Sequence, residues 1–365
     1  MRPSHLRAGS AAIPFRTSFG HAAAVRNRAE NVLVQVEDAS GHYGLGEGCP
    51  RSYVSGEDVP GALAFLKAHA LSLLAIENLG ALRTWIKANA AAIDANPSAF
   101  CAAELALLDL FARQEGKSVE TLLGIPPALV TISTSAVYGS GGMLKFRGQA
   151  FLFARNGMRE AKLKLSGDPA KDLARARTLA RGGRVRLDAN NLWREVREAI
   201  ASLSDLARYA WAVEEPLEAR NWDDMREIGR RTGLAIILDE SLLVRADLDA
   251  APKDIGIIPN LRVSKLGGLL RSLEILAHAP ADVIVGAQVG ETSILARAGL
   301  ALANAAASRL KGFEGAYAPL LLTRDVVTPS LRFGRRGIVH DAAFRELPGL
   351  GLTPNPAFEA ALEAS

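Results

Sequence analysis

Short, largely apolar runs alternate with helical stretches between residues 131 and 315, and this alternation limits the possible fold more than any other feature of the chain. It predicts eight strands, at 131–138, 161–165, 184–189, 211–216, 234–240, 260–265, 282–290 and 310–315. Strands separated by helices form parallel βα units, and eight such units close naturally into a barrel. A doubly wound open sheet is the alternative, but no G-x-G-x-x-G follows the first strand.

Ionisable residues recur in one phase of this alternation. One lies at or near the C-terminal end of each of six consecutive predicted strands, at spacings of 24, 26, 25, 26 and 26 residues. In chain order they are Lys164, Asp188, Glu214, Asp239, Lys265 and Glu291. Because the C-terminal ends of barrel strands converge on one mouth, we expect these side chains to meet in one cavity. A solvated surface would not repeat in this phase, whereas a buried network of ion pairs is a competing explanation.

The signs of these charges indicate a metal site. Asp188, Glu214 and Asp239 come from three consecutive strands, and three crowded carboxylates repel one another unless a cation lies among them. Oxygen ligands suit Mg²⁺, which keeps water or substrate oxygens in its shell, and Mn²⁺ fits the same set. We therefore expect these three residues to bind a divalent cation.

Lysines lie on either side of the carboxylates. Lys162 and Lys164 occupy alternate positions of one strand, so they share a face and lie roughly 6–7 Å apart. Crowded ammonium groups lower each other's pKa, which allows a lysine to act as a base near neutral pH. We expect Lys164 to be neutral part of the time, while Lys162 stays charged and stabilises an anion. Lys265 lies on the strand that follows the carboxylates.

The N-terminal third has a different pattern. Residues 31–38 predict a strand, the Gly-rich and Ser-rich stretch 39–58 predicts a turn region, and a helical pattern extends from about 58 to 116. Paired prolines within 122–130 mark a boundary. We therefore predict an α+β capping domain at 1–125 and a barrel domain at 126–324. The C-terminal segment 325–365 is expected to pack back on the first domain.

Composition excludes several classes of protein. The net charge of +4 is spread along the chain, so no nucleic-acid partner is expected. No apolar run reaches the 18–20 residues of a membrane span, and the first 15 residues have no apolar run long enough for a signal peptide, so neither is expected. Cys49 and Cys101 match neither a metal spacing nor a disulfide framework, which fits a reducing compartment. A cytoplasmic homo-oligomer that acts on a small molecule is expected.

The segments KLK, LDAN, VEEP, LDES and RVSKLGG occur in this order, at residues 162–164, 187–190, 213–216, 238–241 and 262–268. Together they resemble the enolase superfamily, in particular its muconate-lactonizing-enzyme-like subgroup, and AELALLDLFARQEGKSVETLLG resembles the last helix and exit of that family's capping domain. The resemblance covers nearly the whole chain. It implies a modified (β/α)₇β barrel with an N-terminal α+β cap. It also implies removal of the proton α to a carboxylate, giving an enediolate held on Mg²⁺.

The resemblance also assigns roles by position. Lys164 and Lys265 would be acid/base groups on opposite faces of the substrate, and Lys162 would help to neutralise the enediolate oxygen. The metal ligands would be Asp188, Glu214 and Asp239. Glu240 would interact with Lys265, while Asn190 and Glu291 would contact the substrate carboxylate or support the ligands. A weakly acidic α-proton needs such preorganised cations, because the barrier falls only when the developing charge is neutralised.

Substrate recognition is expected from two loops of the cap and from the stretch after the eighth strand. The loop 14–28 supplies Arg16 and His21, and the loop 48–57 supplies Arg51 and Tyr53. Dipeptide epimerases of the family carry an Asp-x-Asp after the eighth strand that binds the substrate's amino group. Gly315 and Tyr317 occupy the corresponding positions here, which disfavours free dipeptides and leaves N-acylated amino acids, proline-like betaines and other carboxylates open as substrates.

The fate of the enediolate separates the remaining alternatives. Two lysines that flank one carbon suit racemisation or epimerisation, which is the leading hypothesis. Cycloisomerisation of the muconate lactonizing type and syn-elimination of the o-succinylbenzoate synthase type use the same lysines and stay open. The complete set of lysines and carboxylates disfavours a barrel without catalytic activity. A metal-dependent hydrolase would need histidines at the strand ends, and none of the six histidines lies there.

Overall fold

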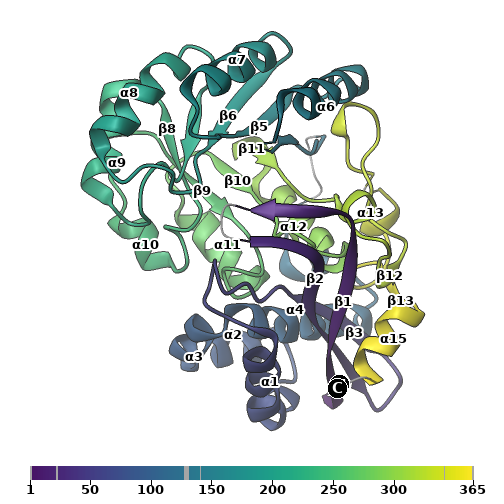
Figure 1. Ribbon diagram of the computed structural model, residues 1–365. Coiled ribbons are helices and arrows are strands. Elements are labelled where there is room, and N and C mark those ends of the chain that lie inside the picture. Colours follow the sequence, from purple (N-terminus) through teal and green to yellow (C-terminus); the bar gives the residue numbers. More distant parts are fainter. Residues whose placement is uncertain (1, 22–23, 127–130, 140, 341, 364–365) are drawn as a thin grey trace.

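The structure is a computed structural model that describes residues 2–21, 24–126, 131–139, 141–340 and 342–363, and the side chains of 17–26 and 342–343 lie outside this description. It consists of a capping unit and a parallel barrel (Figure 1). The cap has an antiparallel sheet in the order β1–β2–β3, formed by β1 (Pro3–His21), β2 (Ala24–Asp38) and β3 (Tyr43–Gly48). Its helices are α1 (Val59–Leu74), α2 (Leu79–Ala88), α3 (Ala90–Ala95), α4 (Pro97–Gln114) and α5 (Val119–Leu123).

Strand β3 lies directly against helix α4, backbone to backbone. Gly44, Gly46 and Gly48 alternate along β3, and a Cβ added at Gly46 would lie 1.8 Å from the main-chain oxygen of Ala102. No larger residue fits on this face, so the glycines permit the contact that buries α4 from Pro97 to Ala112. The prediction of a turn region at 39–58 is therefore wrong for residues 43–48, because these glycines make room for a helix.

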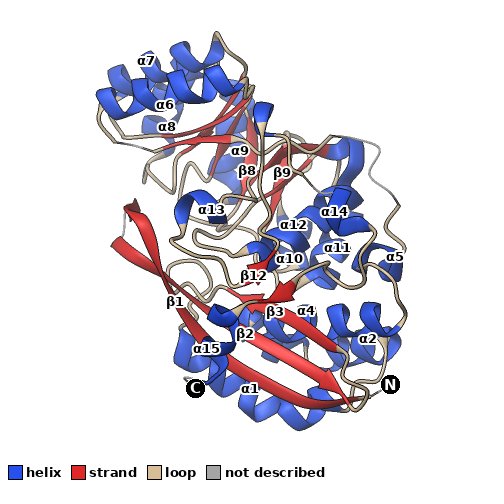
Figure 2. Ribbon diagram, turned by 90° about the vertical axis from the view of Figure 1, so that its right-hand side faces the viewer, coloured by secondary structure: helices blue, strands red, loops and turns tan. Residues whose placement is uncertain are grey.

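The segment 14–28, expected to be a loop, belongs mostly to a long hairpin. β1 pairs with β2 from Pro3 opposite Asp38 to His21 opposite Ala24, with a register shift between Pro14 and Phe19. Figure 2 shows the hairpin rising from the cap sheet toward the barrel. Buried Ile13 alternates with exposed neighbours, as a half-buried strand requires. The expectation of a loop there is corrected accordingly.

The barrel confirms the predicted fold class. Its eight parallel strands follow one another in chain order around a single sheet. They are β4 (Ala136–Tyr138), β5 (Glu160–Lys164), β6 (Arg184–Asp188), β7 (Ala212–Glu214), β8 (Ala235–Leu238), β9 (Ile257–Leu261), β10 (Val283–Val285) and β11 (Leu310–Phe313). A parallel bridge between Thr134 and Phe313, with a 2.8 Å hydrogen bond from the Ser135 N–H to the Phe313 oxygen, joins the first strand to the last.

Among the described residues, seven helices connect the strands around the outside of the barrel (Figure 1). They are α6 (Met143–Asn156), α7 (Pro169–Ala180), α8 (Val196–Leu206), α9 (Trp222–Thr232), α10 (Arg245–Ala250), α11 (Leu269–His278) and α12 (Ser293–Ala306). In the described part of the chain, the helix that directly follows β11 is the four-residue α13 (Ala318–Leu321), so the architecture is (β/α)₇β. Inside the barrel, Ala212, Ile237, Ile258 and Ile284 form an apolar layer separate from the main core.

The C-terminal segment returns to the cap. It contains β12 (Val327–Thr328), α14 (Ala342–Arg345), β13 (Thr353–Pro354) and α15 (Pro356–Glu363). α15 packs against β1, and Glu359 pairs with Arg7 at 3.2 Å. A buried ion pair between Glu120 of α5 and Arg297 of α12 also joins cap and barrel, with nitrogen–oxygen distances of 2.5 and 2.7 Å.

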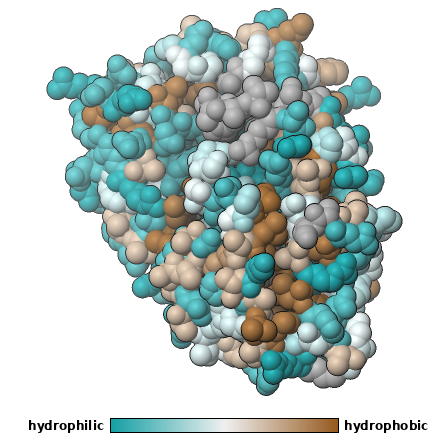
Figure 3. All heavy atoms as spheres, turned by 60° about the horizontal axis from the view of Figure 1, so that its bottom comes forward, coloured by the Kyte–Doolittle hydropathy of each residue, from teal (hydrophilic) through white to brown (hydrophobic). Residues whose placement is uncertain are grey.

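Hydrophilic side chains are spread over the face that Figure 3 shows, with hydrophobic ones gathered mainly in a strip in its lower half. This distribution agrees with charges that are spread along the whole sequence. Among the described helices, none combines the length and the apolar character needed to cross a bilayer.

Candidate active site

The strand register places three of the predicted residues next to one another. Lys164 lies opposite Asp188 in the ladder between β5 and β6, and Asp188 lies opposite Glu214 between β6 and β7. Asp239 directly follows β8. Lys265 lies on a turn after β9. The strand is predicted to extend to residue 265, but it ends at Leu261. These five residues therefore meet at the C-terminal mouth of the barrel.

Lys162 lies beneath this mouth and contacts three carboxylates. Its Nζ is 2.7 Å from Glu214 Oε2, 3.2 Å from Asp188 Oδ2 and 3.1 Å from Glu314 Oε1. Burial lowers the pKa of Lys162, but these carboxylates outweigh it and hold the pKa above its usual range. Lys162 is therefore a permanent cation at the floor of the site.

Lys164 is the most exposed of the three lysines, with 20% of its side chain accessible, against 3% for Lys162 and 0% for Lys265. Its Nζ lies 3.3 Å from Asp188 Oδ2 and donates to Asn190 Oδ1 at 2.8 Å. Asn190 has a left-handed backbone with φ of +45°, and its N–H donates to Asp188 Oδ1 at 3.2 Å. This left-handed conformation, which Asn adopts more readily than most residues, places the amide beside Lys164.

Lys265 faces Asp239 on the other side of the mouth. Its Nζ lies 2.9 Å from Asp239 Oδ1 and donates to the main-chain oxygen of Asp239 at 2.6 Å. Arg262 also pairs with Asp239 and lies 3.6 Å from Glu214 Oε1. Burial raises the pKa of Asp239, but Arg262 and Lys265 outweigh it and hold the pKa below its usual range. Asp239 is therefore charged.

Sequence reasoning missed three charged residues of the site. Arg186 is fully buried and lies 2.7 Å from Glu314 Oε1, and Arg262 bridges two carboxylates. Arg186 precedes Asp188 by two positions on β6, as Lys162 precedes Lys164 on β5. The segment RVRLD of β6 shows this alternation, so the sequence itself could have indicated that Arg186 faces the site. The inward placement of Glu314 follows from the register of the last strand, which the sequence does not show.

The second glutamate of VEEP has a structural role. Glu215 has φ of +41°, and its Oε1 accepts from the N–H groups of Asp239 at 2.6 Å and Ser241 at 2.8 Å. Its Oε2 accepts from Ser241 Oγ at 2.7 Å. Glu215 thus holds the turn that carries Asp239.

The expected contact between Glu240 and Lys265 is wrong for the part of the chain that the structure describes. Lys265 pairs with Asp239, while Glu240 Oε2 is buried and has no hydrogen-bond partner among the described residues. Burial, together with the nearby Asp239 carboxylate, raises the pKa of Glu240 to about 8. The tight turn after β8 directs the two neighbouring acids differently.

Glu291 lies beside the cluster. It is buried in the turn after β10, and its Oε1 accepts from the N–H of Gln288 at 2.6 Å. Gln288 Oε1 in turn accepts from Arg262 at 3.4 Å. Burial raises the pKa of Glu291 to about 8. Among the described residues, Glu291 is thus linked to the carboxylates through Gln288 and Arg262.

The residues expected to contact the substrate differ in their surroundings. Tyr317 donates its hydroxyl to the main-chain oxygen of Ser135 at 2.6 Å, so it closes the seam between β4 and β11. Tyr53 lies on the loop after β3 with 36% of its surface exposed. The side chain of His21 lies outside the described part of the structure.

Arg51, expected on a loop that contacts the substrate, is buried and bonded to other parts of the protein. It is only 2% exposed, and its guanidinium donates to the oxygens of Glu30 at 2.7 Å and Val289 at 3.0 Å and to Asn31 Oδ1 at 2.8 Å. Arg51 therefore fastens the cap to the loop after β10.

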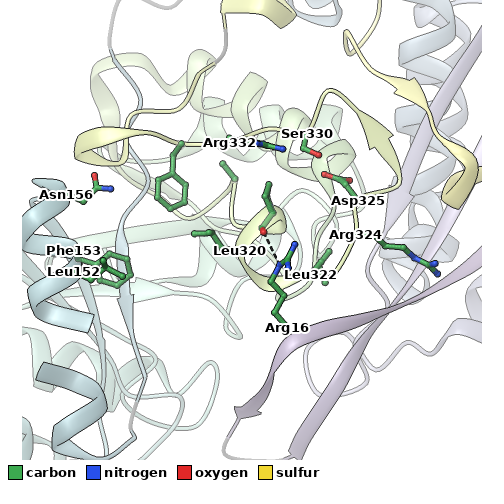
Figure 4. A pocket seen from close by; sticks show the side chains of 13 residues that line it. Arg16, Leu152, Phe153, Asn156, Leu320, Leu322, Arg324, Asp325, Ser330 and Arg332 are labelled. Atoms are coloured by element: carbon green, nitrogen blue, oxygen red, sulfur yellow. Dashed lines mark hydrogen bonds between the residues drawn. The ribbon is translucent and has the colours of Figure 1, made fainter. Parts of the chain in front are cut away.

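Arg16 lines a pocket of about 630 Å³ where β1 meets α6 and α13 (Figure 4). It donates to the main-chain oxygen of Pro319 at 3.2 Å. Phe153, Leu320, Arg332 and Phe333 are among the other lining residues. None of the described residues that line this pocket belongs to the lysine and carboxylate cluster.

The carboxylates fit a divalent cation by donor chemistry. Within the described residues, no group of three or more His, Cys, Asp or Glu side chains forms a ready-made metal site, and Lys162 and Arg262 lie between the carboxylates. Asp188 Oδ2 and Glu214 Oε2 are nevertheless buried without a hydrogen bond, although Lys162 lies within ion-pair distance of both. Unbonded oxygens on adjacent strands are ligands that Mg²⁺ or Mn²⁺ prefers.

Comparison with known families shows to which family the chain belongs. Residues 6–124 match the mandelate racemase/muconate lactonizing enzyme N-terminal domain, and residues 146–358 match the enolase C-terminal domain-like family. The chain belongs to the mandelate racemase/muconate lactonizing enzyme family of the enolase superfamily. The resemblance drawn from the five sequence segments is thereby confirmed.

Curated relatives of this family member are epimerases. The chain is 30% identical to the L-Lys-D/L-Arg epimerase of Methylococcus capsulatus, over 88% of this chain and 91% of that protein. It is 25% identical to the L-Ala-D/L-Glu epimerase of Clostridium acetobutylicum, over 94% and 96% of the two chains. The protein is accordingly an isomerase of the enolase superfamily.

Solved structures agree with this placement. A dipeptide epimerase from Methylococcus capsulatus, crystallised with Mg and the dipeptide L-Arg-D-Lys, superposes with a TM-score of 0.84 at 27% identity, over 97% of this chain and 100% of that one. Muconate lactonizing enzyme shares the fold, with a TM-score of 0.80 at 24% identity over 99% of both chains.

Proposed function

We propose that this family member catalyses Mg²⁺-dependent inversion at the carbon α to a carboxylate, using Lys164 and Lys265 as two bases. The observation that carries the proposal is the order around the barrel. Lys164 ends β5 beside Asp188, Lys265 follows β9 beside Asp239, and the strands bearing the carboxylates lie between them. The two lysines therefore approach the mouth from opposite sides.

The bound cation would be held by Asp188, Glu214 and Asp239 and would neutralise the substrate carboxylate. One lysine, in its neutral form, takes the α-proton on its own face, and the C–H electron pair moves toward the carboxylate. The other lysine, in its charged form, returns a proton to the opposite face, so the configuration inverts. Lys162 supplies a fixed positive charge to the developing anion.

The part of the proposal that concerns the substrate rests on the end of β11. The relatives are named for dipeptides, which carry a free ammonium group. A Cβ added at Gly315 would lie 2.4 Å from the Phe313 ring, so an acidic side chain does not fit there without displacing the ring. Glu314 already pairs with Lys162 and Arg186. We therefore favour amino-acid-derived carboxylates whose nitrogen is acylated over free dipeptides.

The experiment is a screen for α-proton exchange. The purified protein with Mg²⁺ is incubated in D₂O with libraries of N-acyl amino acids, dipeptides and other small carboxylic acids, and α-deuterium is measured by mass spectrometry. We expect deuterium in both stereoisomers of at least one N-acyl amino acid. Ring closure or loss of water without inversion would support cycloisomerisation or syn-elimination instead. Exchange confined to free dipeptides would refute the acylated substrate while retaining the two-base mechanism.

A further inference from the structure

The capping unit holds the turn that carries Lys265 on both of its sides. Just before Lys265, the hydroxyl oxygen of Ser264 accepts a 2.8 Å hydrogen bond from the N–H of Cys49, at the end of β3. Just after it, α11 begins at Leu269, and the carboxylate of Glu104 on α4 accepts from the N–H groups of Leu269 and Leu270, the latter at 3.0 Å. Both Ser264 and Glu104 are fully buried.

Helix α11 thus takes its N-terminal cap from the other unit. The first N–H groups of any helix lack partners within the helix, and Gly268 at the N-cap has no side chain to supply one. Glu104 satisfies two of these donors, and its negative charge suits the positive end of the helix dipole. Gly268 has φ of +110°, and a Cβ there would lie 2.2 Å from Glu104 Oε2. The glycine is therefore required for the carboxylate to enter.

No described residue of the cap makes a comparable contact with Lys164. Its side chain contacts Asp188 and Asn190, both of which belong to the barrel. Within the described residues, the capping unit therefore holds the backbone around one of the two proposed bases, whereas the other is held by the strand ladder of the barrel.

We propose that Glu104 is a positioning residue for Lys265: by fixing the start of α11, it sets the turn from which Lys265 reaches Asp239 and the substrate. The inference rests on the proposed two-base function. If Glu104 has this role, correct placement of Lys265 requires that the cap be docked on the barrel. A displacement of about 1 Å at such a group lowers the rate roughly 100-fold.

The test separates the two faces of the substrate. Exchange of each enantiomer with D₂O is measured separately, and Lys164→Ala and Lys265→Ala identify which enantiomer each lysine serves. We expect Glu104→Ala to lower kcat for exchange of the Lys265-dependent enantiomer roughly tenfold or more. The other enantiomer should change less than about threefold, with KM unaltered for both. Glu104→Gln, which keeps one acceptor oxygen, should recover part of the loss.

Glu47→Gln is the matched control. Glu47 is an equally buried cap residue that accepts from the N–H groups of Thr292 and Leu295 at the start of α12, far in sequence from Lys265. The Glu47→Gln variant should change the exchange rates of both enantiomers to the same degree. If Glu104→Ala does not fold, Glu104→Gln and Ser264→Ala carry the test, since Ser264→Ala removes the tie on the other side of the turn.

Equal losses for both enantiomers in every folded Glu104 and Ser264 variant would overturn the inference and reduce Glu104 to a structural cap. That result leaves the two-base function intact if the lysine variants still separate the enantiomers. If Lys164→Ala and Lys265→Ala do not separate them, the proposed function fails, and this inference fails with it.

Discussion

Lys162 Nζ lies 2.7 Å from Glu214 Oε2, so a buried lysine is paired with a buried glutamate at the floor of the barrel mouth. The pair is part of a larger set, because Asp188 and Glu314 also lie within 3.2 Å of the same nitrogen. A fixed charge in this position favours an anion above it and disfavours a neutral occupant.

Replacing Lys162 by Met should therefore damage both folding and catalysis. Three carboxylates would lose their shared cation, which we expect to lower the free energy of unfolding by about 3–5 kcal/mol. Exchange of both enantiomers should fall roughly 10²–10³-fold, because Lys162 serves neither face in particular. Urea denaturation and exchange in D₂O measure the two effects. A variant with wild-type exchange rates would remove Lys162 from the mechanism.

Metal removal should abolish exchange. The proposed ligands Asp188, Glu214 and Asp239 repel one another and need a divalent cation when substrate binds. Chelator treatment followed by elemental analysis should give an inactive protein, and Mg²⁺ should restore it. Glu214→Gln should weaken the response to Mg²⁺. Full activity in a sample verified as metal-free would disprove the ligand assignment.

Gly46→Ala should unfold the cap or loosen it strongly. The added Cβ would lie 1.8 Å from the Ala102 oxygen on α4, and neither backbone can move without disturbing the buried helix. We expect a loss of about 3 kcal/mol or more, at the upper end of overpacking effects. Gly41→Ala is the control, because no atom lies within 4 Å of its added Cβ, although φ of +85° there costs about 1 kcal/mol. Similar melting temperatures for the two variants would contradict the packing argument.

Asp38 should make stability depend on pH in the acid range. Burial raises its pKa, but hydrogen bonds from Gln114, Ser40 and His42 outweigh it and lower the pKa from 3.8 to about 2. The native state therefore binds fewer protons than the unfolded state between these values. The stabilisation is complete above pH 3.8 and is lost as the pH falls through about 2.

Asp38→Asn tests this sign. The variant should be less stable than the wild type near neutral pH, and the difference should shrink as the pH falls toward 2, because both side chains are then uncharged. Denaturant titrations at several pH values measure it. A difference that stays constant or grows in acid would show that the hydrogen bonds do not favour the charged form.

The barrel and the centre of its site could be predicted because the βα units repeat at a regular spacing in the sequence. Apolar strands about 25 residues apart, each ending in an ionisable residue, fix both the architecture and the convergence of Lys164, Asp188 and Glu214. The register then places neighbours side by side without further information.

Features that depend on contacts between distant segments could not be predicted. Glycine-rich β3 has the composition of a turn, and only the approach of α4 explains why Gly44, Gly46 and Gly48 alternate there. Glu314 enters the site through closure of the barrel, and the carboxylate of Glu215 holds the turn that carries Asp239 and Glu240. The alternating glycines do not reveal which helix packs on them, and the contacts of Glu314 and Glu215 leave no periodic signal in the sequence.

Stereospecific exchange in the two lysine variants tests the central claim most directly. With each enantiomer of the substrate supplied separately in D₂O, Lys164→Ala should retain exchange of one enantiomer and lose the other, and Lys265→Ala should do the reverse. Net racemisation should fall roughly 10²–10⁴-fold in both, the usual contribution of a positioned general base. If one variant loses all exchange while the other retains exchange of both enantiomers, a single base does the chemistry and the two-base account is contradicted.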